Sequence, residues 1–368
     1  MSEIRTAIVG VGNCASALVQ GRCYYADSEA DVPGLITRTF GGYRVCDIRF
    51  VAAFDVDERK VGRDLSEAIF AAPNCTAVFC KQVPRLDLPV QMGHVIDSIA
   101  PHNERYPEAA RFRVCANRHT SVDAARSEIV AALRAARADV LVNYLPVGSE
   151  QNAHFYAECA IEAGCALVNA VPVFLSRTMG GRFKEAGLPI LGDDVKSQVG
   201  ATIVHRVLTK LFEDRGQPIL RTYQLNVGGN TDFLNMLDRS RLESKKQSKT
   251  ESVRSQAGEH PIADADIHIG PSDYIPWLHD NKVCFIRIEA EQFGGVPMSL
   301  ELRLSVEDSP NSAGVIVDAI RAARVALDRK MSGPIVEASA YLFKSPVRQF
   351  SDGDAREMLR RFAAGDSA

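Results

Sequence analysis

Two lysines in one polar stretch have a spacing that could do chemistry. The stretch runs from Leu242 to Thr250, and Lys245 and Lys249 within it are four residues apart. On a helix, residues four apart are neighbours, so the two ammonium groups would repel each other by about 0.2–0.5 kcal/mol. The pattern therefore has two interpretations. It is either a solvated lysine face or a site for an anion whose charge offsets the repulsion.

A glycine-rich turn near the N-terminus is typical of dinucleotide-binding sites. The apolar run of residues 6–9 predicts a buried parallel strand. It leads into Gly10-Val11-Gly12-Asn13-Cys14-Ala15, which is a G-x-G-x-x-A pattern. Gly10 would allow a tight turn, Gly12 would let the backbone approach a pyrophosphate, and Ala15 would let a helix pack closely on the strand. The start of that helix would offer N–H donors to the phosphates.

An acidic residue follows the second predicted strand, residues 50–54. Asp55 would suit the two ribose hydroxyls of NAD, and its carboxylate would repel the 2′-phosphate of NADP. A structural role as the N-cap of a helix from residue 58 onward is compatible with this interpretation. The strand comes late in the chain because residues 23–47 have the character of an insertion.

Strands and helices alternate over the next part of the chain. The pattern predicts helices at 122–138 and 150–163, and strands at 140–143, 166–169 and 189–191. This alternation is typical of an α/β fold with a doubly wound parallel sheet of Rossmann type. The turns after the strands should share one rim of the sheet, where ligands bind. Residues 74–120 show little periodicity, so we expect an exposed excursion or a poorly ordered loop there.

The turn after the strand at 189–191 is a candidate anion site. Ser197 and Thr202 flank a predicted helix start, and Lys196 is close by. A helix N-terminus with a hydroxyl and a lysine is a suitable phosphate cradle. A plain N-capped helix is the alternative that the local sequence leaves open.

The periodicity changes after that helix. Residues 222–227 form a predicted strand, and the alternation at 283–289 and 298–306 predicts antiparallel strands with one covered face. A helix that ends near residue 326 should pack back on the first sheet. We expect a Rossmann-type NAD-binding domain at 1–202 plus 308–368, and an inserted α+β catalytic and oligomerisation domain at 203–307.

Composition argues against several classes of protein. The 368 residues carry a formal net charge of -3, so the whole chain gives no case for nucleic-acid binding. No window approaches the roughly 18 apolar residues of a membrane span, and the first strand starts too early to leave room for a secretory signal. The nine cysteines lack metal-ligand spacing, which predicts mostly buried thiols in a reducing cytoplasm. We expect His205 and His268 to be structural.

The motifs as a set resemble those of the inositol-1-phosphate synthases, in the bacterial, actinobacterial branch of that family. The resemblance covers nearly the whole chain, is weakest at residues 74–120, and is carried by residues 10–13, 192–202, 226–236, 242–249, 308–315 and 340–346. It implies conversion of glucose 6-phosphate to an inositol phosphate with tightly held NAD. The implied steps are oxidation at C5, enolisation at C6, aldol attack on the C1 aldehyde and return of the hydride. The resemblance also implies a homotetramer.

The resemblance assigns roles to individual residues. The family's four active-site lysines are matched by Lys245, Lys249, Lys282 and Lys344, with Asp308 as a catalytic carboxylate and Asp280 expected to orient Lys282. The substrate and phosphate contacts are expected from Ser197, Gln198, Gly200, Thr202, Asn230 and Lys249. The NAD contacts are expected from Gly10, Gly12, Asn13, Cys14, Asp55, Leu145, Pro146, Asn169, Asp194 and Asp308.

The lysines have both a binding and a catalytic use in this chemistry. Cationic donors aimed at the enolate oxygen in a water-poor site stabilise it, and a lysine with a depressed pKa can move protons near neutral pH. We expect Lys245 or Lys249 to transfer the proton at C5, and Lys282 and Lys344 to contact the enolate and aldehyde oxygens.

Three alternatives stay open. A paralogous carbocycle synthase would use the same lysines on another hexose phosphate, such as fructose 6-phosphate. A non-catalytic NAD-binding protein would not need three of the lysines together, and a plain dehydrogenase would accumulate NADH. Some members of the family respond to cations, but the sequence shows no metal-ligand set.

Overall fold

The structure is a computed structural model. It describes residues 3–26, 33–116, 118–241, 243–258, 260–270 and 273–366, without the side chains of Glu243 and Lys245. Leu242, the first residue of the stretch that carries the two lysines, therefore lies outside the described residues. So does the Lys245 side chain, whose backbone belongs to a described helix.

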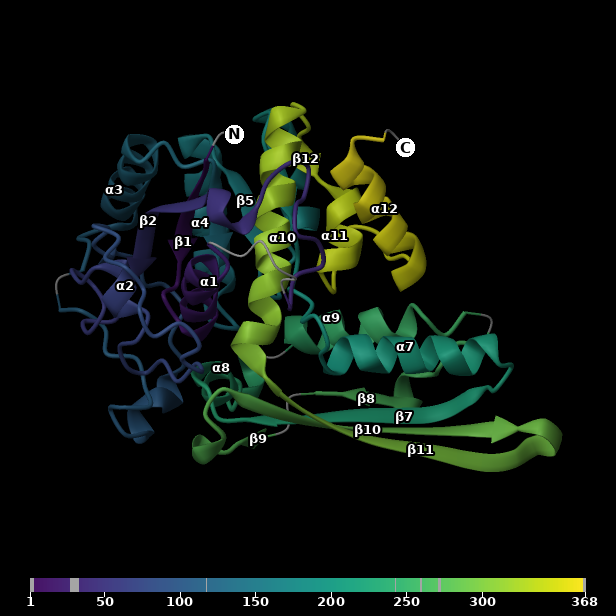
Figure 1. Ribbon diagram of the computed structural model, residues 1–368. Helices are drawn as coiled ribbons and strands as arrows, with labels where there is room; N and C mark the ends of the chain where they lie inside the picture. Colours follow the sequence, from purple (N-terminus) through teal and green to yellow (C-terminus); the bar gives the residue numbers. More distant parts are fainter. Residues whose placement is uncertain are drawn as a thin grey trace.

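Seven strands form the first sheet, in the order β12-β6-β5-β4-β1-β2-β3 with every pair parallel (Figure 1). Their bounds are β1 (Ile4–Val9), β2 (Ile48–Asp55), β3 (Gln91–Met92), β4 (Val140–Asn143), β5 (Ala166–Asn169), β6 (Pro189–Leu191) and β12 (Gly333–Pro334). The central position of β1, with β2 and β4 on either side, is that of a dinucleotide-binding sheet. The predicted fold class is confirmed.

Helices cover both faces of this sheet. One face carries α3 (Val122–Ala135) and α4 (Glu150–Ala163), and the other carries α1 (Asn13–Tyr24) and α10 (Asp308–Asp328) (Figure 1). Beyond α10 lie α11 (Val336–Leu342) and α12 (Asp352–Ala364), and short helices complete the layers: α2 (Leu65–Ala68), α5 (Leu175–Thr178) and α6 (Gly180–Glu185). Because the central strands are covered on both sides, most of their residues are apolar, and Ile8, Val142 and Val168 are fully buried. As predicted, α10 packs against this sheet, touching β1, β4, β5 and β6.

Residues 74–116 contain little regular structure, but they are anchored to the fold. The Oδ1 atom of Asn13 accepts the backbone N–H of Cys75 at 2.7 Å and of Thr76 at 3.2 Å, and Ser98 and Asn103 are buried. The prediction of an exposed excursion was therefore wrong for the side of this segment that faces the fold. Polar anchors, the short strand β3 and the buried Val90 hold it, and contacts this scattered leave no periodic pattern in the sequence.

The second sheet has the order β11-β10-β7-β8, with β9 also paired to β7. Its strands are β7 (Ile219–Gly228), β8 (Ile267–Ile269), β9 (Asp273–Tyr274), β10 (Asn281–Gln292) and β11 (Val296–Glu307). β10 runs antiparallel to both β7 and β11, as the alternation predicted. The two short strands run parallel to β7, so the sheet is mixed.

Two helices lie on the inner side of the second sheet, between that sheet and the α11–α12 pair (Figure 1). They are α7 (Ala201–Asp214) and α9 (Glu243–Arg254), and the short α8 (Thr231–Asn235) lies closer to the first sheet. Phe212 of α7 packs with Cys284, Ile286 and Ile288 of β10 in an apolar cluster. His205 of α7 is fully buried and bonded to Thr222 Oγ1 at 2.8 Å, which agrees with the structural role expected for it.

Candidate active site

A cavity lies where the carboxyl ends of the first-sheet strands meet the second sheet. It is lined by most of the predicted site residues: Gly10, Gly12, Asn13, Cys14, Asp55, Leu145, Pro146, Asp194, Ser197, Asn230, Lys249, Lys282, Asp308 and Lys344. The turns that follow β1, β2, β4, β5 and β6 all reach it, which is the shared rim expected of a doubly wound sheet.

The glycine turn after β1 leaves open space at the start of α1. Gly10 has a φ of +88°, and a Cβ there would lie 2.6 Å from the carbonyl oxygen of Tyr144. A side chain is therefore excluded at Gly10. A Cβ on Gly12 would meet nothing within 4 Å, and Gly12 is the N-cap residue of α1. The first N–H groups of α1 thus face a cavity without a capping side chain in front of them.

Asp55 ends β2 at the same rim, and backbone donors fix its carboxylate. Oδ2 accepts the N–H of Val11 at 2.7 Å, and Oδ1 accepts those of Val56 at 2.7 Å and Asp57 at 2.9 Å. The helix considered from residue 58 onward does not form: turns follow β2, and the next helix, α2, begins at Leu65 with Asp64 as its N-cap residue. Asp55 is therefore oriented toward the cavity by its neighbours.

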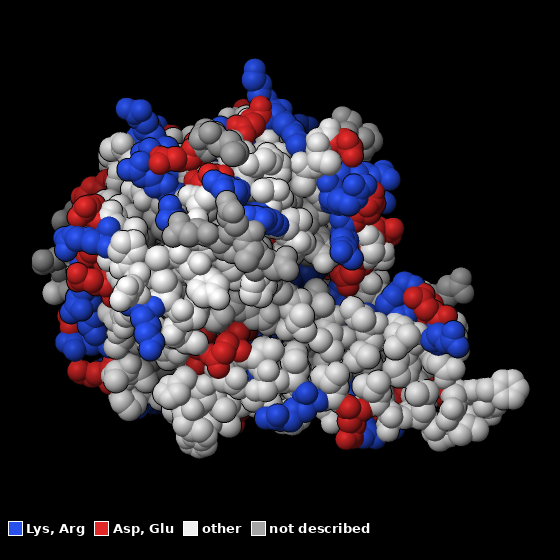
Figure 2. Space-filling model, viewed as in Figure 1, with Lys and Arg blue, Asp and Glu red and all other residues white. Residues whose placement is uncertain are grey.

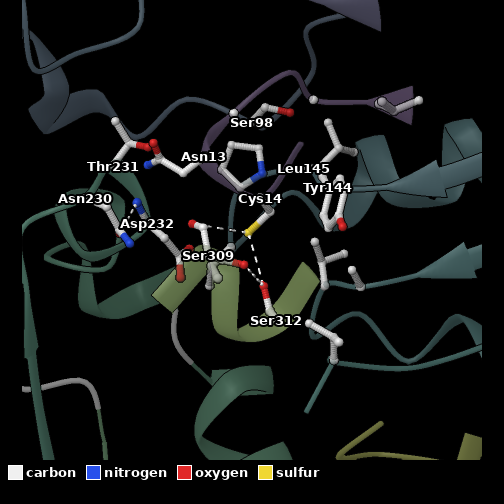
Figure 3. Close-up of a pocket in the computed structure, with 18 of the residues that line it drawn as sticks. Asn13, Cys14, Ser98, Tyr144, Leu145, Asn230, Thr231, Asp232, Ser309 and Ser312 are labelled. Atoms are coloured by element: carbon white, nitrogen blue, oxygen red, sulfur yellow. Dashed lines mark hydrogen bonds between the residues drawn. The ribbon is translucent and has the colours of Figure 1, made fainter. Parts of the chain in front are cut away.

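Cys14 lies on the wall between α1 and α10 (Figure 3). Its sulfur is 3.9 Å from the hydroxyl oxygens of both Ser309 and Ser312. Burial, followed by the charges of Asp280 and Asp308, raises the pKa of the Cys14 thiol to about 12. The thiol is therefore neutral at physiological pH and acts as a packing group.

Two lysines on the second-sheet side of the cavity are paired with carboxylates. Lys282 Nζ lies 3.0 Å from Asp308 Oδ1, and Lys344 Nζ lies 2.9 Å from Asp194 Oδ1. Burial lowers the pKa of Lys282, but Asp308 more than offsets it, so the pKa is raised above its ordinary value. Lys249 of α9 is 4% exposed and lines the same space. The structure thus brings together three of the four predicted lysines.

A smaller hollow joins the cavity at the N-terminus of α7. It is lined by Ser197, Gly200, Thr202, Gln224 and Asn226 together with Lys249, Lys282 and Lys344. Gly200 is the N-cap residue of α7, so this helix also begins without a capping side chain. The plain N-capped helix is thereby excluded. A helix N-terminus facing three ammonium groups is suited to a multiply charged anion.

Among the predicted site residues whose side chains the structure describes, three line neither the cavity nor the hollow. Asn169 is fully buried behind the rim, where its Nδ2 donates to Asp193 Oδ1 at 2.6 Å and to the Val173 carbonyl at 2.7 Å. The Gln198 side chain bonds the Gly34 carbonyl. Asp280 accepts hydrogen bonds from Asn230 Nδ2 at 3.0 Å and Ser309 Oγ at 2.9 Å. These residues support the site from behind.

Two expectations about neighbouring groups need correction. Lys196, taken as part of the phosphate cradle, is buried and donates to the Ala340 carbonyl at 2.9 Å. Lys282 has Asp308 as its ion-pair partner, whereas Asp280 was expected to orient it. Burial, followed by the charge of Asp308, raises the pKa of Asp280 to about 7. The carboxyl group of Asp280 is therefore partly protonated near neutral pH.

Comparison with known proteins decides the family. Residues 200–309 match the family model for myo-inositol-1-phosphate synthase. The chain is 55% identical to the inositol-3-phosphate synthase of Mycolicibacterium smegmatis over 99% of this chain and 98% of that protein. The chain belongs to the inositol-3-phosphate synthase family.

A second relative agrees with this assignment, and a solved structure shares the fold. The inositol-3-phosphate synthase of Corynebacterium glutamicum is 53% identical, with 98% of each chain covered. The crystal structure of a myo-inositol-1-phosphate synthase-related protein from Thermotoga maritima has a TM-score of 0.81 with 24% identity, over 98% of each chain, and shows the same fold. The family and the actinobacterial branch predicted from the motifs are confirmed.

The cavity of this family member also contains residues that the motifs did not single out. Tyr144, Thr231, Asp232, Ser309 and Ser312 line it (Figure 3). Ser312 follows Asp308 by four residues on one helix, a spacing that would have placed both on one face. His94, Ser98, Ile99 and Phe112 also line it, but they come from the segment that lacks periodicity, where no sequence signal was available.

Nothing in the described ranges suggests a metal centre or a membrane span. Among the described residues, no group of three or more His, Cys, Asp and Glu side chains could hold a metal ion. No helix within the described part of the chain is long and apolar enough to cross a membrane.

Proposed function

We propose that the protein is an NAD-dependent isomerase that converts D-glucose 6-phosphate to 1L-myo-inositol 1-phosphate. The observation that carries this proposal is the convergence of Lys249, Lys282 and Lys344 at the N-terminus of α7, next to the glycine turn. One cavity can therefore take a dinucleotide at one end and a phosphorylated sugar at the other.

The residues at the first-sheet end fit NAD. Gly12 leaves room for a pyrophosphate at the N-terminus of α1, and Asp55 presents a fixed carboxylate at the end of β2. Leu145 and Pro146 form part of the wall between them and the lysines. NAD bound there would supply reversible hydride acceptance, so substrate and product would be isomers with no net redox change.

The hollow at α7 would hold the sugar phosphate. Ser197 and Thr202 supply hydroxyls at the helix N-terminus, and the three lysines supply positive charge. A phosphate anchored there would place the sugar carbons in the main cavity, because the two spaces share Ser197 and all three lysines.

Lys282 and Lys344 would stabilise charge that develops on the sugar oxygens. Each is held by a carboxylate, so each ammonium group is fixed before the reaction begins. A preorganised donor to a developing oxyanion is worth about 3–4 kcal/mol. Lys249 or Lys245 would move the proton at the C5 hydroxyl, and Asn230 lies at the edge of the same space for a sugar hydroxyl.

The test is to identify the ring that the enzyme forms. Purified protein is incubated with NAD and glucose 6-phosphate, and the product is analysed by NMR together with NADH absorbance. We expect an inositol phosphate without accumulation of NADH. A five-membered ring from fructose 6-phosphate would support the paralogue instead, net NADH would indicate a dehydrogenase, and binding of NAD without turnover of either sugar would indicate a non-catalytic protein.

We also propose that residues 203–307 form a catalytic and oligomerisation domain, to which Asp308 and Lys344 add groups from outside that range, and that the protein assembles into a homotetramer in the cytoplasm. The outer face of the second sheet exposes apolar side chains, with Phe285 42% and Tyr223 37% accessible. On the face shown in Figure 2, the protruding end of the β10–β11 hairpin is almost free of charged side chains, whereas acidic and basic residues intermingle around the first sheet. Light scattering of the protein and of Phe285→Glu tests this, and an unchanged mass would contradict it.

A further inference from the structure

Helix α9, which carries Lys249, is docked by polar contacts. Val253 is its only aliphatic residue, yet Ser248 and Ser252 are fully buried. Ser248 Oγ donates to Asp194 Oδ2 at 2.7 Å and accepts from Ser345 Oγ at 2.8 Å. Val253 is also fully buried, in an apolar cluster with Ile267 and Ile269 of β8. One aliphatic side chain cannot fix the whole helix, so the position of the rest of α9 depends on directional bonds.

Arg206 of α7 supplies the other anchor for α9. Its side chain is fully buried, and Nη1 bonds the Ser252 carbonyl and, at 3.1 Å, Ser255 Oγ. Nη2 donates to the Phe350 carbonyl at 3.1 Å and to Asp352 Oδ1 at 3.0 Å, while Nε reaches Asp352 Oδ2 at 3.0 Å. One guanidinium therefore joins α7, α9 and the start of α12.

Asp352 extends the connection to the rim of the cavity. Its Oδ1 also lies 3.4 Å from Lys196 Nζ, and Lys196 donates to the Ala340 carbonyl at 2.9 Å. Lys196 adjoins the turn that carries Ser197, and Ala340 precedes the segment that carries Lys344. The three charged side chains thus connect α7, α9, the turn that carries Ser197 and the segment that carries Lys344, which all contribute groups to the phosphate hollow.

We infer that Arg206 and Asp352 are positioning residues that set where α9 holds Lys249 relative to Lys344 and the N-terminus of α7. The inference rests on the proposed function, in which these groups act on one sugar phosphate. Neither residue lines the cavity or the hollow, so both act through α9. The planar fork of arginine matches a carboxylate and several carbonyls at once, which a lysine cannot do.

The experiment compares Arg206→Lys and Asp352→Asn with the unmodified enzyme. Displacement of catalytic groups by about 1 Å can cost about 100-fold in rate, so we expect kcat to fall by about that factor while NAD affinity stays within about twofold. Hydrogen exchange should speed up in residues 243–256 and stay unchanged in the β1–α1 segment. A merely structural role would instead lower protection throughout the chain.

A matched control comes from the same helix. Arg254 of α9 pairs with Asp264 at the surface, so Arg254→Ala removes an arginine without touching the buried cluster. We expect its kcat and its exchange pattern to match those of the unmodified enzyme. An effect as large as that of Arg206→Lys would overturn the inference.

A triple variant guards against simple misfolding. Arg206→Met, Asp352→Leu and Lys196→Met together remove all three charges of the buried cluster, and apolar replacement of a buried ionic cluster often preserves stability. We expect a folded protein with the same fall in kcat and the same local loss of protection. If this variant or Arg206→Lys turns over at the unmodified rate, the inference is wrong and the proposed function stands. If the unmodified enzyme acts on neither sugar phosphate, the proposed function fails, while hydrogen exchange still tests the anchoring of α9.

Discussion

The two ends of the cavity are built by different means. The first-sheet end is made from turns that each follow one strand, and its chemistry comes from backbone geometry at Gly10 and Gly12 and from one carboxylate, Asp55. The second-sheet end collects side chains from β10, α9, α10 and the segment after α11, joined by ion pairs. The first end is therefore sensitive to backbone substitutions, and the second to changes of charge.

This difference predicts that turnover and cofactor binding can be separated by mutation. Lys344→Met should lower kcat at least about 1,000-fold, because it removes an oxyanion donor and leaves the buried Asp194 without this cation. NAD affinity, measured by calorimetry, should change little. Lys246→Met is the control, because Lys246 is exposed on α9. A parallel loss of NAD binding would break the separation between the two ends.

At the other end, Gly10→Ala should destabilise the fold. The added Cβ meets the Tyr144 carbonyl at 2.6 Å, and the φ of +88° is strained for alanine, so we expect a loss of about 3 kcal/mol in the free energy of unfolding. Chemical denaturation measures it. Gly12→Ala, which has open space around its Cβ, should keep its stability and lose NAD affinity instead. Equal stability of the two variants would contradict this account of the turn.

Substitution of Asp55 should have a more modest effect, on the preference for NAD over NADP. Asp55→Asn keeps one acceptor oxygen for the Val11 N–H, but it loses the negative charge and turns an amide NH2 toward the N–H groups of Val56 and Asp57. We expect NAD affinity to fall about tenfold, equivalent to about 1.4 kcal/mol, and NADP affinity to rise relative to it. Titration with both dinucleotides checks this. An unchanged ratio of the two affinities would place the ribose elsewhere.

The last predicted effect concerns the pH dependence of stability. It comes from His205 of α7, the helix that packs against the second sheet. Burial lowers the pKa of His205 to about 4 from its ordinary 6.5, so the unfolded chain binds the extra proton first as the pH falls. The contribution of His205 to stability is complete above about pH 6.5 and is lost as the pH falls toward 4. Between pH 8 and 5.5 we expect a loss of about 1.4 kcal/mol from this group. His205→Gln should flatten that slope in pH-dependent denaturation, and an unchanged slope would contradict this account.

The first end of the cavity was predictable from short-range sequence. Buried parallel strands are apolar runs, so residues 6–9, 140–143 and 166–169 were located correctly, and the turns after them had to share an edge. The second end was not predictable in this way. By spacing alone, Lys249 suits a solvated face, yet it is buried because Ser248 and Ser252 bond inward. Only the resemblance of whole motifs to a known family brought the lysines together.

Other misses have the same physical origin. Residues 74–116 reach the cavity through single polar anchors such as Asn13, and β8 and β9 are too short to show alternation. The buried Lys196 could not be told from a phosphate ligand, because its partner Asp352 is 156 residues away. Contacts set by one donor and one acceptor across such distances carry no periodic signal.

Helix α10 contributes to both ends of the cavity, and its helical register determines where Asp308 points. It begins at Asp308, which holds Lys282, and runs 21 residues across the first sheet. Since an α-helix turns by about 100° per residue, inserting one residue after Ser312 would swing Asp308 away from Lys282 while the rest of the helix kept its packing. A chimera that exchanges residues 203–307 between relatives must therefore conserve helical register at this junction as well as sequence.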